Sequence, residues 1–540
     1  AGPGATVENL TFLRGADLTG GVMPYGPSLQ VSAGLVTNCA VSAAYIVNNA
    51  PVYATGGVIA DSIVTGTTYK ALNLAPVVSL SANARMVNCR VANNACSRGA
   101  IVADGANVLM EKLVVQGNVQ PGSAYMYEWA CPGVRLLGGA TIVDSLVCSN
   151  SFSGSCSDTT CCAGIRALQG TIDRCIIKDN KGNITRCYGC GVWLAGTSVI
   201  RNSLVVGNVA KDSAYNYAGG IYLAGGSVQN CTVVGNTTGN AAGADGIYRT
   251  GGTVVNTIVS GNGSDPTRQI SAAGGVTYTC VNGADIAGEG NRNCDPLFKN
   301  AAEGDYSLQL SSLLRDAGTP IAAVTNDLVG TERPQGDGYD IGAYEYPFTG
   351  GPECDIGVVG LVEGPVPFAL EAEAIVVGGV GVGYTWTVAA GDAEPVVITD
   401  QGATLAYEVT TPGRVTVALE TTFADGSKFT ATKPDLAYAG PHEVFASTYG
   451  GNVWPYDTAA KAAWNVNDAI AACGATAENP GICHLAEGTY TAENGYGEDA
   501  PHIFVLDRPV ILRGDSRDYV ILDGENTRRI IRIENENAAL

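Results

Sequence analysis

Histidine and basic side chains are scarce in this sequence. Only 3 of its 540 residues are histidine, and these, His442, His484 and His502, all follow residue 440. The first 440 residues therefore cannot supply a Ser/His/Asp triad or another histidine-assisted hydrolytic site. Lys and Arg number 30 against 51 Asp and Glu, a net charge of −21, which would repel a phosphate backbone. We expect no nucleic-acid partner.

Long apolar runs without glycine are also lacking. The uncharged stretch 374–391 is interrupted by five glycines, which favours strands over a membrane span. Hydrophobic residues make up 46% and glycine 71 of 540 residues, a composition too apolar for disorder and too rich in glycine for helical bundles. The chain is predicted to be all-β, and its length argues for about three or four domains.

Methionine is scarce, with 4 residues, whereas cysteine is abundant, with 17. So many cysteines in an acidic chain predict an oxidising compartment, so we expect a secreted protein that is extracellular or on a cell surface. The odd count leaves at least one cysteine without an intramolecular partner. Residue 1 is Ala, so we expect that a signal peptide has been removed or that the chain is a piece of a longer protein.

A motif of about thirty residues repeats through the first half of the chain. Segments 191–208, 220–236 and 246–262 each contain an apolar triplet, a glycine turn, a short strand and a closing Gly-Asn. Steps of 32, 30, 28, 28 and 26 residues separate the closing asparagines Asn118, Asn150, Asn180, Asn208, Asn236 and Asn262. This period and these short strands predict a right-handed parallel β-helix over residues 1–293.

Stacking of equivalent positions should fill the interior of such a β-helix. We expect Val205, Val233 and Ile258 to stack inward, and the closing asparagines to take the left-handed conformation and bond to neighbouring coils. Four cysteines that follow a turn residue should pack as small apolar side chains: Cys39, Cys89, Cys175 and Cys231. A denser group is expected to form disulfides, with a zinc half-site at CYGC as the alternative: Cys156, Cys161, Cys162, Cys187 and Cys190.

Residues 294–346 contain a second set of motifs. They run Asp295-Pro-Leu-Phe, Gly304-Asp-Tyr-Ser-Leu, Asp316-Ala-Gly-Thr, Arg333-Pro-Gln-Gly and Asp340-Ile-Gly-Ala-Tyr-Glu-Tyr. This run resembles the carboxy-terminal signature of the choice-of-anchor Q family, bacterial surface proteins with pectin-lyase-like β-helices. The resemblance implies that residues 294–348 complete the β-helix. No cofactor is predicted; calcium at GDGYD, residues 336–340, is an open alternative to a simple turn, and no metal ligand is assigned.

A proline-rich junction precedes alternating strands over residues 353–440. Trp386 and the Pro412-Gly413 turn resemble those of an immunoglobulin-like sandwich of the polycystic-kidney-disease (PKD) type. The resemblance implies a spacer domain with Trp386 in its core.

Residues 441–540 look like the start of a pectin-lyase-like β-helix, with a capping helix followed by the first coils. Asp457 is predicted to be the helix N-cap. An apolar stripe at helical spacing follows: Ala459, Ala463, Val466, Ile470 and Cys473. A disulfide from Cys473 to Cys483 would hold the helix on the first coil, and Cys280 and Cys294 are further disulfide candidates.

The order of these modules is reversed relative to a self-contained β-helix, because the body comes first and the start comes last. Joined end to end, residues 528–540 and 1–15 give successive strands at about the right period. An open row of strand N–H and C=O groups is a template for pairing. We therefore predict head-to-tail assembly of copies into a filament, or one repeat of a longer surface fibre, with this interface: Ile530, Ile531, Ile533, Val7, Leu10 and Phe12.

Two other functions are compatible with parts of the sequence. Aromatic insertions at 123–133 and 212–220 favour a surface adhesin that binds glycans. The pectin-lyase-like fold also hosts polysaccharide lyases and glycoside hydrolases, but no paired carboxylates are evident, and Asp158, Asp173 and Asp179 are interpreted as solvated turn residues. The sequence therefore predicts that the protein is not an enzyme.

Overall fold

The chain is described here by a computed structural model, which covers residues 5–13, 27–42, 45–46, 49–69, 75–96, 98–121, 130–153, 161–183, 187–211, 216–271, 274–347, 350–360, 362–495, 502–525, 529–535 and 537–539. It has two compact units, Ala1–Phe348 and Thr349–Leu540. Both are built almost entirely of strands, as the composition predicts. Among the described residues, no helix has the length and apolar character that crossing a bilayer requires.

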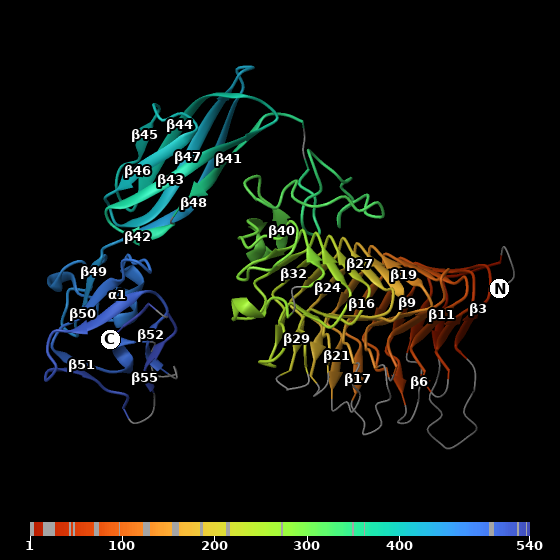
Figure 1. Cartoon of the computed structure of the whole chain (residues 1–540). Coiled ribbons are helices and arrows are strands. Elements are labelled where there is room, and N and C mark those ends of the chain that lie inside the picture. The colour runs from red at the N-terminus through yellow and green to blue at the C-terminus, as the bar shows by residue number, and fades with distance from the viewer. Residues whose placement is uncertain are drawn as a thin grey trace. The chain divides into compact units, whose positions relative to one another are not determined.

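Unit 1 is a parallel β-solenoid whose complete coils contribute one strand to each of three sheets, called A, B and C here (Figure 1). Sheet A consists of β1 (Thr6–Glu8), β4 (Leu35–Thr37), β8 (Val58–Ala60), β12 (Arg85–Val87), β15 (Leu109–Glu111), β19 (Ala140–Val143), β23 (Gly170–Asp173), β27 (Val199–Arg201), β31 (Ser227–Gln229), β35 (Thr253–Val255) and β37 (Val276–Thr277). Sheet B consists of β2 (Thr11–Leu13), β5 (Ala40–Ser42), β9 (Ile63–Thr65), β13 (Arg90–Ala92), β16 (Val114–Gln116), β20 (Leu146–Cys148), β24 (Ile176–Lys178), β28 (Leu204–Val206), β32 (Thr232–Val234), β36 (Ile258–Ser260) and β38 (Cys280–Val281).

Sheet C is shorter and consists of β3 (Leu29–Val31), β7 (Val52–Ala54), β11 (Val78–Ser81), β14 (Ile101–Asp104), β18 (Val134–Leu137), β22 (Ile165–Ala167), β26 (Val192–Leu194), β30 (Ile221–Leu223) and β34 (Ile247–Arg249). Strands after sheet B form two smaller parallel sheets: β6 (Tyr45–Ile46) with β10 (Thr68–Tyr69), and β17 (Val119–Pro121), β21 (Ser151–Ser153), β25 (Lys181–Gly182), β29 (Val209–Ala210) and β33 (Thr237–Thr238). The last segment of the unit has the antiparallel pair β39 (Phe298–Asn300) and β40 (Asp305–Leu308), with single 3-10 turns at Pro266–Arg268 and Ala301–Glu303.

The interior of the solenoid is apolar, because the central side chain of the strands in sheets A and B, and two side chains of the strands in sheet C, point inward and stack on their equivalents in the next coil. Val205 lies beside Val233, as predicted, but the next inward residue is Val259 rather than Ile258. Ile258 pairs with Thr232 and packs in a separate cluster with Leu308 and Ile341. The prediction was wrong by one residue, and a one-residue slip reverses the face of a strand.

The closing asparagines form a buried ladder. Each backbone N–H and side-chain Nδ2 donates to the Oδ1 of the next coil, as from Asn150 to Asn180 at 3.1 and 3.0 Å. The same contacts connect Asn94, Asn118, Asn150, Asn180, Asn208, Asn236 and Asn262. The prediction of bonding between coils is confirmed. The left-handed conformation belongs instead to the residue before each asparagine, such as Gly117 and Gly207.

Cys39, Cys89, Cys175 and Cys231 occupy one position of the corner between sheets A and B, as predicted, and all are buried. In other coils this position holds a serine that makes the same hydrogen bond. The Cys39 thiol donates to the Thr37 carbonyl at 3.2 Å, and the Ser62 hydroxyl of the next coil donates to the Ala60 carbonyl at 2.6 Å. Burial raises the pKa of Cys175 to about 12. These cysteines are structural, because a buried neutral thiol is inert.

The disulfide predictions differ from the structure. Cys280, Cys294, Cys473 and Cys483 are free thiols, as are Cys162, Cys187 and Cys190. The Cys280 and Cys294 sulfurs are 3.9 Å apart, whereas a disulfide requires about 2.05 Å. Cys161 is disulfide-bonded, and Cys156 lies outside the described residues. In the described residues no three His, Cys, Asp or Glu side chains are grouped as a metal site would need.

Unit 2 begins with two antiparallel sheets that share a core. One sheet contains β41 (Glu353–Val359), β43 (Phe368–Val377) and β46 (Thr404–Val409), and the other contains β42 (Glu363–Pro365), β48 (Lys428–Gly440), β47 (Gly413–Phe423), β44 (Gly381–Ala390) and β45 (Val396–Ile398). Trp386 is fully buried in this core, as predicted, and its Nε1 donates to the Gly402 carbonyl at 3.0 Å.

The rest of unit 2 is parallel again. Its sheets are β49 (Glu443–Ala446), β50 (Gly481–Leu485) and β53 (Val510–Gly514); β51 (Gly488–Tyr490) and β54 (Val520–Leu522); and β52 (His502–Leu506) and β55 (Arg529–Ile533). Single 3-10 turns lie at Ala459–Lys461 and Ala492–Asn494.

The helix α1 (Val466–Ala472) packs on these strands but is shorter than predicted. Its N-cap is Asn465, whose side chain accepts from the Asn467 N–H. Asp457 instead accepts a bond from Lys461, and Ala459 is exposed in a 3-10 turn. The stripe from Ala463 onward is buried as expected.

Candidate assembly edges

The first described coil of unit 1 presents open strand edges. Strands β1, β2 and β3 each stand first in the strand order of sheets A, B and C. A coil visits the sheets in the order C, A, B, so β1 and β2 belong to a coil whose sheet C strand is not among the described residues. Among the described residues, sheet C therefore begins one coil later than sheets A and B.

The three predicted residues of this edge differ in environment. Val7 and Phe12 are half-buried and pack against the solenoid core from β1 and β2. Leu10 lies in the corner between these strands and is 50% exposed, while its carbonyl accepts from the Ala40 N–H at 2.9 Å. Val7 and Phe12 thus form the apolar end of the stack, and Leu10 lies at its rim.

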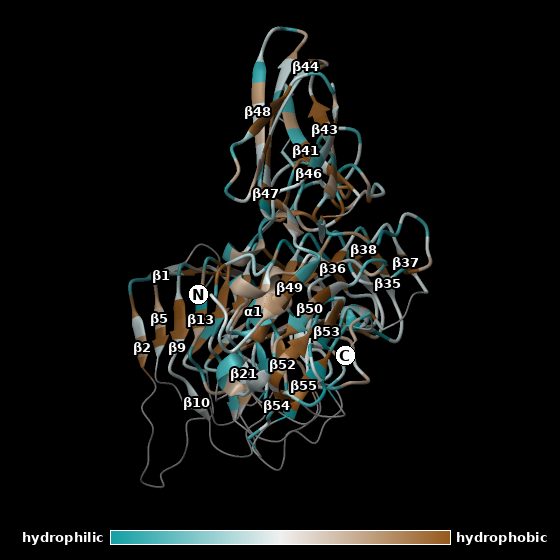
Figure 2. Cartoon of the chain, turned by 90° about the vertical axis from the view of Figure 1, so that its left-hand side faces the viewer, coloured by the Kyte–Doolittle hydropathy of each residue, from teal (hydrophilic) through white to brown (hydrophobic). Residues whose placement is uncertain are grey.

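The parallel part of unit 2 presents the opposite edges. Strands β53, β54 and β55 stand last in their sheets, and they carry hydrophobic side chains (Figure 2). A hollow of about 320 Å³ opens among the inward residues of these strands, including Leu512, Leu522 and Ile531. Ser516 and Arg517 also line the hollow, so its wall is mostly but not entirely apolar.

The three predicted isoleucines of β55 do not share one face. Ile531 and Ile533 pair with the buried Phe504 and Leu506 and therefore point inward. Ile533 is 50% exposed because no strand covers its open side within the described residues. Ile530 lies between them in the strand alternation and therefore points to the opposite face of this sheet.

Connection lengths relate the coils of the two units. Two residues separate β4 from β5, and two separate β50 from β51; three separate β3 from β4, and three separate β52 from β53. The long insertion follows sheet B in unit 1 and follows β51 in unit 2. By this correspondence β53 is of the sheet A type, β54 of the sheet B type and β55 of the sheet C type.

The edge of β53 has one contact of its own. Ala539 accepts from the Leu512 N–H at 2.9 Å and donates to the Val510 carbonyl at 3.1 Å. A strand added to β53 has to displace this short contact, while the edges of β54 and β55 have no such bridge in the described residues.

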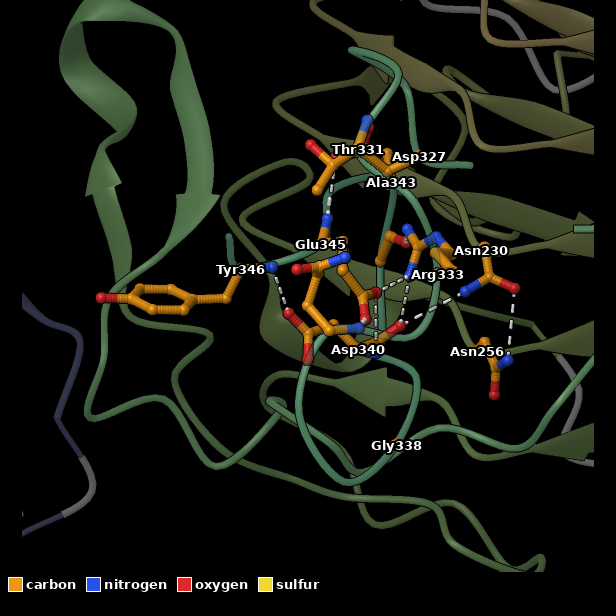
Figure 3. A network of polar contacts seen from close by, with 12 residues as sticks. Asn230, Asn256, Asp327, Thr331, Arg333, Gly338, Asp340, Ala343, Glu345 and Tyr346 are labelled. Atoms are coloured by element: carbon orange, nitrogen blue, oxygen red, sulfur yellow. Dashed lines mark hydrogen bonds and ion pairs between the residues drawn. The ribbon is translucent and has the colours of Figure 1, made fainter. Parts of the chain in front are cut away.

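A buried polar network holds the segment 294–347 on the solenoid (Figure 3). Arg333 is bonded to Glu345 at 2.6 Å, and both side chains are fully buried. Arg333 also donates to the carbonyls of Asp340 and Gly342, and Asn230 of the solenoid donates to the Asp340 carbonyl. The sequence motif Arg-Pro-Gln-Gly with Asp-Ile-Gly-Ala-Tyr-Glu contained these residues, but only the structure reveals their pairing.

The Asp340 carboxylate accepts backbone N–H bonds from Asp316 at 2.8 Å and from Tyr346 at 2.6 Å. Burial, followed by the neighbouring Glu345, raises its pKa to about 7. Both carboxylate oxygens therefore bond to backbone groups outside the GDGYD segment and connect it to Asp316 and Tyr346.

Asp173 and Asp179, two of the aspartates that the sequence places in turns, differ in solvent exposure. Asp173 is buried, contrary to its interpretation as a solvated turn residue, because Arg201 at 3.0 Å and Arg174 at 3.4 Å pair with it. Asp179 is exposed in a left-handed turn, as interpreted, and Asp158 lies outside the described residues.

An aromatic cluster lies on the outer side of sheet C. Tyr222 and Tyr248 stack with ring centroids 5.6 Å apart, and Tyr217 lies 4.9 Å from both Tyr188 and Tyr248. One strand earlier, Arg166 lies 4.3 Å over the Trp193 ring. Only Tyr217 of this cluster belongs to the predicted aromatic insertions, because outward positions of sheet C are found only once the register is known.

Comparison with protein-family models, with curated proteins and with solved structures gives no match to this chain. The parallel β-solenoid is compatible with the pectin-lyase-like architecture suggested by the sequence.

Proposed function

We propose that the protein is an extracellular structural subunit that joins copies of itself head to tail through its open strand edges. The observation that carries the proposal is the complementarity of the two ends. Unit 1 lacks a sheet C strand before β1 among its described residues, and the last strand of unit 2, β55, is of the sheet C type. In the joined state, β1 of one copy lies beside β53 of the other, β2 beside β54, and β3 beside β55.

The energetics favour such a joint. Three added pairs of short strands would form roughly six to nine main-chain hydrogen bonds at a net of about 1 kcal/mol each, less the two bonds of Ala539 that β53 gives up. Val7 and Phe12 would enter the hollow lined by Leu522 and Ile531, at roughly 25 cal/mol per Å² of apolar surface buried. These terms oppose an association cost of about 4–15 kcal/mol. Because the contact is heterologous and does not close on itself, repetition gives a filament.

The test is the substitution Ile531→Asp. It places a carboxylate without a partner inside the joint, and we expect filaments in negative-stain images to disappear while the melting temperature of unit 2 changes little, because Ile531 lies at the edge of its core. Ile521→Asp is the matched control: Ile521 is 51% exposed on β54, and this variant should assemble like the parent. Equal assembly by both variants would refute the proposal. The mass of the native material distinguishes separate subunits from tandem repeats of one long chain.

The aromatic cluster supports a second candidate, a surface adhesin that binds glycans. Half-buried tyrosines from neighbouring coils, Tyr222 and Tyr248, offer stacking surfaces at a spacing set by the solenoid. Tyr248→Ala should then reduce retention of the protein on immobilised oligosaccharides. Unchanged retention, or none by the parent, would leave assembly as the only supported function.

A further inference from the structure

A pocket of about 500 Å³ lies within unit 2, between the second antiparallel sheet and the segment 449–464. Its lining combines one exposed aromatic ring with charged groups: Trp454, Tyr438, Arg414, Asp435 and Asp392. None of these residues belongs to the assembly edges or to the aromatic cluster of unit 1. A cavity of this size holds a small organic ligand, and a few polar groups around an apolar surface are typical of such sites.

The floor of the pocket is bare backbone. Gly391 and Gly413 lie against each other, and a Cβ on Gly413 would come within 2.5 Å of the Gly391 Cα. Both have φ values, +52° and +142°, that side chains disfavour. The two glycines therefore allow two chain segments to approach closely beside Trp454, and both line the pocket.

The main chain around Trp454 is held in place, and 43% of the residue is exposed. Its segment is fixed by main-chain bonds from Gly451 to Ala460 and from Asn452 to Ala462, both at 3.0 Å, and from Val453 to Lys461 at 3.0 Å. Left-handed residues flank it at Asn452 and Tyr456. An exposed indole on a fixed main chain offers a large stacking surface with only two side-chain torsions to order.

The polar groups face the same pocket. Arg414 and Asp435 form a largely exposed ion pair at 3.3 Å at the pocket, and Asp392 adds a second carboxylate. Carboxylates accept hydrogen bonds from hydroxyl groups, and the guanidinium donates to hydroxyl oxygens. The pocket carries one positive and two negative groups, so an anionic ligand would be repelled. Tyr438 contributes its ring only, because its hydroxyl donates to the Ala472 carbonyl at 2.9 Å.

We propose that this pocket binds a neutral sugar residue, with the apolar face of the pyranose ring on the Trp454 indole and its hydroxyls bonded to Arg414, Asp435 and Asp392. A pyranose has both an apolar C–H face and a rim of hydroxyls, so it matches the aromatic wall and the charged groups together. The proposal does not depend on head-to-tail assembly. The pocket is lined by residues of β44, β47 and β48 and by Trp454, whereas the proposed assembly edges are β53, β54 and β55.

The full chain is titrated with cellotriose, maltotriose, mannotriose and N-acetylchitotriose by calorimetry, with trigalacturonate as the anionic comparison. At least one neutral trisaccharide should bind with a Kd of about 1 mM or tighter, and trigalacturonate should not. Trp454→Ala should weaken binding at least tenfold, Trp454→Phe should retain part of it, and Asp392→Asn should weaken it without unfolding the chain.

Tyr449→Ala is the matched control, because Tyr449 is 90% exposed in the same segment but does not line the pocket. It should bind like the parent. The proposal is overturned if none of the four neutral trisaccharides binds, if trigalacturonate binds equally well, or if Trp454→Ala and Asp392→Asn both bind like the parent.

Discussion

Each asparagine of the buried ladder forms hydrogen bonds with the coil before it and the coil after it, so each one connects three coils. Asn180 accepts from the backbone N–H and Nδ2 of Asn150, and its own Nδ2 donates to the Val147 carbonyl and to Asn208. All these groups are buried, so removing one side chain leaves its neighbour's donors without acceptors. Because an unsatisfied buried donor costs about 1–3 kcal/mol, the ladder should be intolerant of truncation at any rung.

We therefore expect Asn180→Ala to lower the free energy of unfolding of unit 1 by about 3–5 kcal/mol, because two donors of Asn150 lose their acceptor. Denaturant unfolding followed by circular dichroism measures the change. Asn183→Ala, at an exposed position a few residues away, should change it by less than about 0.5 kcal/mol. Similar losses in both variants would mean that the ladder is not the cause.

Asp340 should make unit 1 less stable as the pH rises. Its pKa is about 7 in the folded chain and about 3.9 in the unfolded chain, so the folded state binds the proton more tightly between these values. The stabilisation is complete below about pH 4 and is lost as the pH rises through 7. Between pH 5 and pH 8 the loss should be about 2–3 kcal/mol.

The loss is measured as the difference in urea-unfolding free energy between the parent and Asp340→Asn at each pH. The variant should be less stable at pH 5 but should lack this part of the pH slope. The exposed Asp337→Asn should keep the parent's slope. An unchanged slope in Asp340→Asn would assign the pH dependence to another group.

At the scale of elements, the repeat predicted the solenoid, because a period of 26–32 residues with a closing Gly-Asn leaves few alternatives to stacked coils. The repeat does not determine which face of every strand points inward. The strand Ile258–Ser260 contains only apolar or small residues, so no alternation of polar and apolar side chains distinguishes its two faces. The helix was overextended to Asp457 because its apolar spacing continues into a segment that a 3-10 turn and main-chain pairing hold in another conformation. The pocket at Trp454 was missed, because its residues come from distant strands.

Thr11 tests whether the open edge of β2 is used. Thr11 pairs with Ala40 of β5, and the Ala40 N–H donates to the Leu10 carbonyl. Along a parallel strand, successive residues direct their N–H and C=O groups to opposite neighbours. The Thr11 N–H therefore points to the open side of β2. Thr11→Pro removes only this donor. We expect an unchanged melting temperature and a critical concentration for assembly raised about fivefold, as the loss of about 1 kcal/mol predicts.

Thr11→Val keeps the N–H and should assemble like the parent. The critical concentration is measured by sedimentation of filaments at a series of protein concentrations. If proline and valine have the same effect on it, β2 is not part of the joint.

At the scale of the whole molecule, the two edges are different surfaces, so one chain can be blocked at either edge separately. Phe12→Asp places a carboxylate at the inward position of β2, and Ile531→Asp does so on β55. Each variant alone should stay monomeric, because every joint would contain one damaged edge with a buried charge.

Mixed in equal amounts, the two variants should form a species of twice the chain mass and nothing larger. The intact unit 2 edge (β53–β55) of the Phe12→Asp chain meets the intact unit 1 edge (β1–β3) of the Ile531→Asp chain, and both remaining edges are blocked. Analytical ultracentrifugation distinguishes this dimer from monomers and filaments. A symmetric interface would behave differently, because a substitution that abolished it would do so in the mixture as well, so a mixture that stays monomeric contradicts head-to-tail joining even if the parent forms filaments.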